Sequence, residues 1–401
     1  MKKHFFPKTL YGKMAFTLII MAMYLGGREL PLYGVDLNAY EAFRDSSADL
    51  IMQTIGGDRY KTSILALGIS PFMFSMLFVQ VGVAFKKSGD KTYASPKKIT
   101  WATLIFMLVW ASVQAYFTSS SIMYVYDGGI QLVIAKIVSS IQMVTGAYVI
   151  LWMATRNGRY GIGGQTLLIY VNILDSVVST IRQSKPEELI IIGLVSAAAL
   201  LITIIFENSE YRIPMQRISI HSIYSDKNYT PIKLNPIGMM PVMFTSAFFV
   251  LPVYIFTGLS MLFPDDKNIQ WAVENMDTTH PFGIGMYIFM LYLITIMFAF
   301  IFISPKNLTE NMQKTGDAIT GLRAGGWTRH HLASRLFLIS IFSATVMGFF
   351  LAAPLYLQMK GYITATVMNL PSVIIAMGSI NCNLYREFIA VRDYDAYVPF
   401  I

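Results

Sequence analysis

Long apolar runs separated by short polar stretches form the basic pattern of this chain. Ten runs are long enough, at roughly 17–25 residues, to cross a bilayer as helices. They cover residues of about 14–30, 68–85, 100–119, 130–154, 165–181, 188–206, 238–260, 283–303, 332–356 and 364–384. The pattern therefore predicts an all-α polytopic membrane protein with ten transmembrane helices.

The stretch that leads into the second run changes character halfway. It is polar from Gly56 to Ser63, almost wholly apolar from Ile64 onward, and contains Gly68 and Pro71 at the junction. Broken segments of this kind are tolerated at membrane depth only where protein or a water-filled cavity surrounds them. We therefore expect the blocked mouth of a pore here, with the other spans arranged around it.

Composition and charge agree with a membrane protein and suggest its orientation. The chain is 55% hydrophobic and 13% charged, whereas soluble domains carry about 25% charged residues. With the N-terminus inside, the inner segments hold 22 of the 31 Lys and Arg residues. Because positive loops remain cytoplasmic, both termini are predicted to be cytoplasmic in a multi-pass plasma-membrane protein. Anionic membrane lipid is an expected partner of this face, and no direct nucleic-acid partner is needed to explain its charge.

Ten spans can divide into two halves of five. Because five is odd, a second half built like the first would run in the opposite direction, as in an inverted repeat. The predicted halves are residues 1–182 and 189–401, and the short polar turn 183–188 is the predicted hinge. This prediction depends on the number of spans alone.

Two inner loops, 207–237 and 304–331, are longer than a simple connection requires. Loops of that length are usually functional or disordered. The first mixes aromatic, β-branched and basic residues and is predicted to be an ordered hairpin. The second begins like a helix and then contains a Gly-rich turn around Arg323. The loops are either solvated segments that set the topology or a docking surface on which Arg supplies charge-assisted contacts.

The sequence contains none of the common motifs that indicate enzyme activity. There is no Walker A sequence, no GxSxG and no metal-ligand spacing among the five His residues and the single Cys382. We therefore predict no enzyme activity, no cofactor and no metal. Lys136 and Asp175 lie within apolar spans, and such charges deserve a functional hypothesis. They could pair with each other, or Asp175 could face a cavity, so an ion-coupled transporter of a small solute is the alternative function.

Four stretches together resemble SecY, the channel subunit of the general protein-export translocon. They are residues 63–80, 145–169, 211–216 with 234–248, and 307–328. One departure is Ala324, where the family usually has Pro after the loop arginine, and the external loops and the C-terminal tail are short. The chain is more similar in these respects to the accessory SecY paralogue of Gram-positive bacteria. That resemblance implies the export of serine-rich glycoproteins with an accessory SecA-type ATPase.

The resemblance implies an hourglass channel formed by two five-helix halves, with an apolar ring at its waist and a short plug on its outer side. The ring residues that match by position are Ile69, Met73, Tyr170, Leu174, Met243 and Ile375. The plug would lie at about 54–63 and include Thr54, Ile55, Gly56, Gly57, Asp58, Arg59 and Tyr60. A ring of apolar side chains blocks ions by dewetting and opens for a passing chain, so the function is physical gating.

The resemblance also implies partners. They are a SecA-type motor ATPase on the cytoplasmic face, a small SecE-like membrane subunit, and preproteins with signal sequences, which would leave through a lateral gate between spans 2–3 and 7–8. The expected motor contacts are Arg323 first, followed by Arg212, Arg217 and Arg329. The alternative roles of Arg323 are a helix C-cap or a contact with lipid phosphate.

Overall fold

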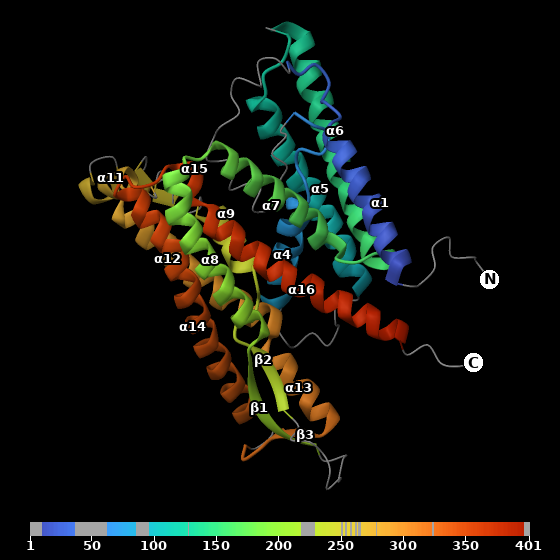
Figure 1. Ribbon diagram of the computed structural model, residues 1–401, viewed down its shortest axis with the longest axis vertical. Coiled ribbons are helices and arrows are strands. Elements are labelled where there is room, and N and C mark those ends of the chain that lie inside the picture. The colour runs from blue at the N-terminus through green and yellow to red at the C-terminus, as the bar shows by residue number, and fades with distance from the viewer. Residues whose placement is uncertain are drawn as a thin grey trace, which may run out of the picture. The chain divides into compact units, whose positions relative to one another are not determined.

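A computed structural model gives the fold of the chain, and helices dominate it (Figure 1). It describes residues 10–36, 62–85, 96–126, 128–217, 229–249, 252, 255–256, 259–260, 263, 266–277, 279–322 and 325–396. The helices of the first part are α1 (Leu10–Arg28), α4 (Ser70–Phe85), α5 (Pro96–Ser121), α6 (Gly129–Tyr160) and α7 (Gly164–Gln183). Those of the second part are α8 (Pro186–Asn208), α9 (Met240–Phe248), α11 (Lys267–Glu274), α12 (Pro281–Ile303), α13 (Pro305–Thr315), α14 (Gly326–Met359), α15 (Ala365–Met368) and α16 (Leu370–Ala396).

Each of the ten apolar runs contains at least one helix in the described part of the chain, so the prediction of a polytopic all-α fold is confirmed. Seven helices in the described part of the chain are long and apolar enough to cross a membrane. The helices α4, α9 and α16 do not meet that criterion. The helix α4 has only 16 residues because it follows the break, and α16 is too polar over much of its length, since it contains residues such as Asn381 and Asn383.

Contacts within the chain divide it into two compact units. The N-terminal unit contains Met1–Arg182 and Asn383–Ile401, and the C-terminal unit contains Gln183–Cys382. The chain therefore passes between units twice, once after α7 and once within α16. The predicted inverted relation between halves stays a prediction.

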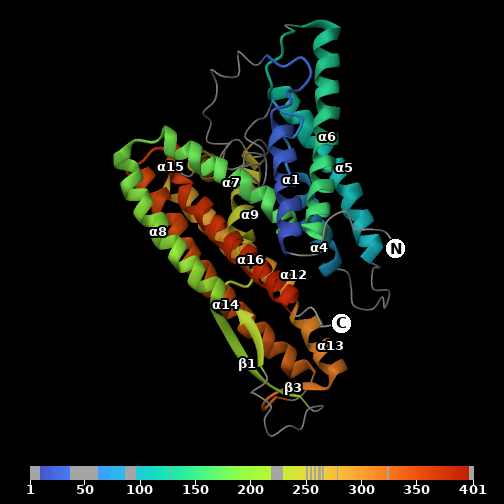
Figure 2. The ribbon, with the colours of Figure 1, turned by 45° about the vertical axis from the view of Figure 1, so that its right-hand side comes forward.

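In the N-terminal unit, α1, α5 and α6 lie side by side (Figures 1 and 2). Fully buried alanines, such as Ala111 and Ala115 of α5 and Ala135 of α6, bring the helix backbones close together. Small residues have this role in membranes because lipid supplies no hydrophobic drive for helices to associate. Met107 and Met143 fill the remaining space and are fully buried.

In the C-terminal unit, α12 packs along α14, and α9 packs on α12. Phe244 of α9 and Phe298 of α12 meet edge to face, with ring centroids 5.5 Å apart. This is a favourable arrangement for aromatic pairs. A core of α8, α9, α12, α14 and α16 residues, including Leu291, Leu351 and Ile375, completes the unit.

The two long loops, 207–237 and 304–331, contribute the strands of one small antiparallel sheet of order β2-β1-β3. Its strands are β1 (Glu210–Arg217), β2 (Tyr229–Lys233) and β3 (Asp317–Ile319). The strand pair predicted between 207 and 237 is thus confirmed. The strand β1 pairs with β2 through its first part and with β3 from Met215 onward. Pro214 stands where the partner changes, which suits a residue that has no N–H for a second ladder.

Apolar residues fix this sheet to the helices beneath it. Ile213, Ile232 and Ile319 share a buried cluster with Met312 of α13 and Leu336 of α14. Figures 1 and 2 show the sheet beside α13, at the end of α14 where that helix begins. The loops that the sequence separates by about a hundred residues are therefore one structural element.

Candidate functional site

The break before α4 is an ordered turn. Gly68 has a φ of 58°, a left-handed conformation that glycine adopts without steric cost. The Gly68 N–H donates to the carbonyl of Leu65 at 2.9 Å, and the Ser70 hydroxyl donates to the carbonyl of Leu67 at 3.0 Å. The turn is therefore held by hydrogen bonds of its own at the point where α4 begins.

The same break rests directly on α6. A methyl group added at Gly146 would collide with the carbonyl oxygen of Ile64. The backbone at Ile64 therefore occupies the space next to Gly146 that a side chain at this position of α6 would need. Ile64 itself packs against the buried cluster of the N-terminal unit.

Backbone hydrogen bonds join the two ends of the loop that contains the predicted plug. The Leu32 N–H donates to the Thr62 carbonyl at 2.8 Å, and the Ile64 N–H donates to the Leu30 carbonyl at 3.0 Å. Pro31 and Ser63 form the antiparallel bridge between these bonds. The plug residues Thr54 to Tyr60 lie outside the described residues, and their role stays a prediction.

A second set of contacts holds residues 33–36, which precede this loop. Val35 bridges to Tyr124, and the hydroxyls of Tyr124 and Ser139 are 2.6 Å apart. A hydrogen bond with Tyr33 raises the pKa of Tyr126 above its ordinary value. The residues on both sides of the loop are therefore held by α6 and by the turn that leads into it.

Four of the six predicted ring residues belong to the N-terminal unit, as two helical pairs. Ile69 and Met73 are 2% and 6% exposed at the start of α4, and the Met73 N–H donates to the Ile69 carbonyl. Tyr170 and Leu174 are half-buried and one turn apart on α7. Residues four apart share a helix face, so each pair presents one continuous surface.

The other two predicted ring residues are fully buried in the C-terminal unit. Met243 lies on α9, and Ile375 lies on α16. Ile375 belongs to the core cluster that also contains Val242, the neighbour of Met243. The ring as a whole stays a prediction.

A polar seam joins α1 to α6 and α7 inside the N-terminal unit. The Tyr24 hydroxyl donates to Asn172 Oδ1 at 2.8 Å. Arg28 Nη2 lies 3.0 Å from Asp175 Oδ2, and the Arg28 side chain is 4% exposed. Near the other end of α1, the Thr17 hydroxyl donates to Asn157 Oδ1 at 3.1 Å.

The suggested pair of Asp175 with Lys136 is therefore wrong. Asp175 pairs with Arg28, and the backbone carbonyl of Lys136 accepts hydroxyl bonds from Ser119 of α5 and from Ser140. The sequence contained the signal for the true pair, because Tyr24 and Arg28 are four residues apart while Asn172 and Asp175 are three apart. Such spacings put each polar pair on one helix face.

The basic side chains of the predicted docking surface are displayed on and beside the sheet. The Arg212 guanidinium lies 4.6 Å from the centre of the Tyr229 ring. Arg217 pairs in register with Asp317 of β3, which joins the two loops. Arg329 is exposed in the first turn of α14. Arg323 lies outside the described residues.

A buried carboxylate anchors the sheet to the helices, and no motif around it predicted this role. Glu207, at the end of α8, is 1% exposed. It accepts hydrogen bonds from the Ser379 hydroxyl at 2.5 Å and from the Asn235 amide at 3.3 Å. Lys233 of β2 lies 3.5 Å from its second oxygen. Since four segments meet at this carboxylate, it positions the loop relative to α8 and α16.

No group of three or more His, Cys, Asp or Glu residues among the described positions is arranged to hold a metal ion. What the described residues do form is a broken span, apolar helix faces and a sheet that carries basic side chains. Comparison with known proteins gives the family of the chain.

The SecY family model matches residues 63–381. The chain is 28% identical over 392 residues to the accessory Sec system protein translocase subunit SecY2 of Streptococcus agalactiae, covering 96% of this chain and 94% of the relative. It is 27% identical over 365 residues to the subunit of the same name from Leuconostoc gelidum, covering 86% of each.

Solved structures share the fold. The structure of a protein-conducting channel matches with a TM-score of 0.66 at 16% identity, covering 100% of this chain and 98% of the other. Sec61 in the canine ribosome-channel complex matches with a TM-score of 0.64 at 15% identity, with the same coverage.

Proposed function

The chain belongs to the SecY family of protein-translocation channels, and we propose that it passes unfolded preproteins across the plasma membrane with the help of a SecA-type motor ATPase. It is a multi-pass membrane protein and the channel subunit of a translocase that works with other Sec components. The motor, the substrates and the orientation are the proposed parts. Both termini are placed in the cytoplasm because positive loops gather there.

The observation that carries the motor proposal is the sheet β2-β1-β3. Both long loops of the cytoplasmic face contribute to it, and Arg212, Arg217 and Arg329 belong to it or follow it closely. Arg212 is held over Tyr229, so little conformational freedom remains to be lost when a partner carboxylate binds it. Arg323, which follows β3 in the sequence and lies outside the described residues, is the fourth proposed contact.

Charge reversal tests the docking surface. We expect Arg212→Glu and Arg323→Glu to abolish most ATPase-driven export in proteoliposomes. Arg156→Glu is the matched control, because Arg156 also lies over an aromatic ring, Trp152, but belongs to α6 and not to the sheet. Export that is unchanged in both sheet variants, or lost equally in the control, would contradict the proposal.

We propose further that the channel is of the accessory type and exports serine-rich glycoproteins. The curated relatives reported above are named as accessory Sec subunits, which supports this assignment. A small SecE-like membrane subunit would complete the complex. Co-purification of the full-length chain with its motor and with a serine-rich preprotein, but not with general secretory preproteins, is the expected result.

The six predicted ring residues are the proposed constriction. Met73, Tyr170 and Met243 replace the isoleucine-like residues that are usual in the family, and Met repacks easily around different apolar partners. We therefore propose a softer seal than an isoleucine ring would give. No observation favours the alternative transporter, because Asp175 is engaged by Arg28.

A further inference from the structure

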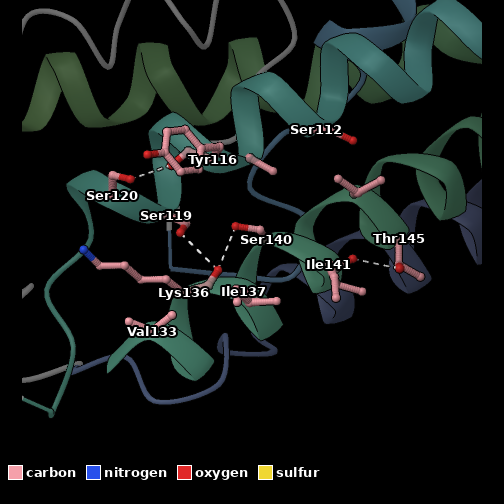
Figure 3. A pocket seen from close by; sticks show the side chains of 12 residues that line it. Ser112, Tyr116, Ser119, Ser120, Val133, Lys136, Ile137, Ser140, Ile141 and Thr145 are labelled. Carbon is pink, nitrogen blue, oxygen red and sulfur yellow. Dashed lines mark hydrogen bonds between the residues drawn. The ribbon is translucent and has the colours of Figure 1, made fainter. Parts of the chain in front are cut away.

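A groove of about 600 Å³ runs between α5 and α6 of the N-terminal unit (Figure 3). Pockets that bury small ligands have similar volumes, about 300–1,000 Å³. The groove is lined by Ser112, Ala115, Tyr116, Ser119, Ser120, Val133, Lys136, Ile137, Ser140, Ile141, Val144 and Thr145. All of these residues come from α5 and α6, so the groove belongs to one helix pair.

Its serine and threonine hydroxyls do not offer free donors to a ligand, and its one other hydroxyl, that of Tyr116, belongs to a side chain exposed at the rim. Ser112, Ser120 and Thr145 each donate to the carbonyl four residues earlier in their own helix. Ser119 and Ser140 both donate to the Lys136 carbonyl, as Figure 3 shows. The wall of the groove is therefore apolar toward an occupant along most of its length.

Lys136 is the exception. Its amine forms no ion pair with any carboxylate in the described part of the chain. In Figure 3 the side chain extends away from Ser119 and Ser140, toward one end of the groove. An occupant would therefore meet one positive charge at one end and hydrocarbon elsewhere.

The length of α6 places Lys136 at a definite depth. The helix has 32 residues and is therefore about 48 Å long at 1.5 Å per residue. Centred on a hydrocarbon core of about 30 Å, it would extend about 9 Å beyond the core at each end. Lys136 is about 10 Å from the first residue of α6, which puts it at the boundary between acyl chains and headgroups.

We propose that this groove binds a phospholipid of the outer leaflet, with its phosphate on the Lys136 amine and one acyl chain along Ile137, Ile141 and Val144. A positive charge at the level of the phosphates and an apolar channel below it match the two ends of such a lipid. A transmembrane helix of a partner is the competing occupant, because small residues such as Ala115 and Ser119 line the groove and helices approach closely through small residues. The rim residues Tyr116 and Ile141, which are 66% and 61% exposed, would hold a helix backbone away from that lining.

Native mass spectrometry of the full-length protein in detergent tests the proposal. The probes are phosphatidylglycerol and a diacylglycerol with the same chains. We expect one tightly retained phosphatidylglycerol, no comparable retention of diacylglycerol, and an affinity about fivefold weaker in Lys136→Gln, since one basic residue at a membrane surface has roughly that effect. Equal retention by the variant and the original chain would overturn the proposal.

Two further variants sharpen the test. Ser112→Phe fills the groove while leaving Lys136 in place, and should weaken binding as well. Lys360→Gln is the matched control, because Lys360 is a lysine at the outer end of α14 that lies over Tyr356 outside the groove, and it should bind like the original chain.

A photo-crosslinking amino acid at Ile141 identifies the occupant in native membranes. We expect lipid adducts on the full-length protein. A stoichiometric protein adduct in place of lipid would overturn the proposal in favour of a partner helix. Melting temperature and gel-filtration profile, compared for every variant, show which chains are folded well enough to count.

Discussion

The guanidinium of Arg28, at the end of α1, lies 3.0 Å from the carboxylate of Asp175 on α7. One turn earlier, Tyr24 donates to Asn172 at 2.8 Å, and the same tyrosine ring lies under the Arg28 guanidinium. These contacts give an intramembrane acid a structural partner. A charge that would otherwise suggest ion coupling is thereby explained by the packing of α1 on α7.

We predict that Asp175→Asn lowers the stability of the protein. We expect no ion-coupled uptake of a small solute by the original chain or by this variant. Hydrogen bonds to charged groups contribute about 1.5–3 kcal/mol, and the loss should be at the lower end because the Asp175 side chain is 36% exposed. Thermal unfolding of Asp175→Asn, Arg28→Leu and the double variant measures the coupling. Glu210→Gln, at an exposed position of β1, is the control and should melt like the original chain. Purely additive effects in the double variant would contradict a direct pair.

A methyl group at Gly146 should disturb the break before α4. Because it would meet the backbone carbonyl of Ile64 and not a flexible side chain, the break must move, at a cost of about 1–3 kcal/mol as in other overpacked sites. We expect Gly146→Ala to melt earlier and to leak ions in proteoliposomes. The control is Gly158→Ala on the same helix, where the nearest atom would be 3.7 Å away. A Gly146→Ala protein as stable and tight as the control would show that the break does not rest on α6.

Alanine substitution should have opposite effects at two glycines near α4. At Gly68, with a φ of 58°, alanine is strained in the left-handed region by about 1–2 kcal/mol. At Gly82, within α4, an added methyl group meets nothing within 4 Å, so alanine gains about 1 kcal/mol of helix propensity. Melting temperatures should therefore fall for Gly68→Ala and rise slightly for Gly82→Ala. Two changes of the same sign would rule out the left-handed turn as the cause.

Glu207 should matter most for the strand β2. Glu207→Gln keeps the size of the side chain but removes the charge that Lys233 and Ser379 contact, at a cost of about 1–3 kcal/mol. We expect faster amide hydrogen exchange in β2 and a lower melting temperature. Glu210→Gln, at an exposed neighbouring position, should change neither. Unaltered exchange of β2 in Glu207→Gln would mean that the apolar cluster alone holds the sheet.

Much of the fold followed from the apolar runs because a membrane helix must satisfy its backbone internally and needs a minimum length. Each of the ten predicted runs contains a helix for that reason. The helix boundaries differ from the ends of the apolar runs where a helix continues into polar residues. For example, α14 begins at Gly326, six residues before the apolar run, and α6 extends to Tyr160 beyond its run.

The site was less accessible from the sequence because its decisive contacts join distant segments. Arg28 and Asp175 are far apart in the chain, and a composition-based argument links Asp175 equally well to Lys136. The pairing of β1 with β3 joins Arg217 to Asp317, and nothing local in either loop specifies that partner. Burial of Glu207 depends on Asn235 and Ser379, whose positions only tertiary packing determines.

The central claim is that an unfolded protein passes through this chain at the predicted ring, and site-specific crosslinking of a stalled export substrate tests it most directly. A photo-crosslinking amino acid is placed at Met73 and at Met243, and in separate variants at Leu194, which is 73% exposed on α8. We predict substrate adducts at Met73 and Met243 that depend on the motor and on its ATP, and none at Leu194. Adducts that are absent from both ring positions, or equally strong at Leu194, would contradict the account.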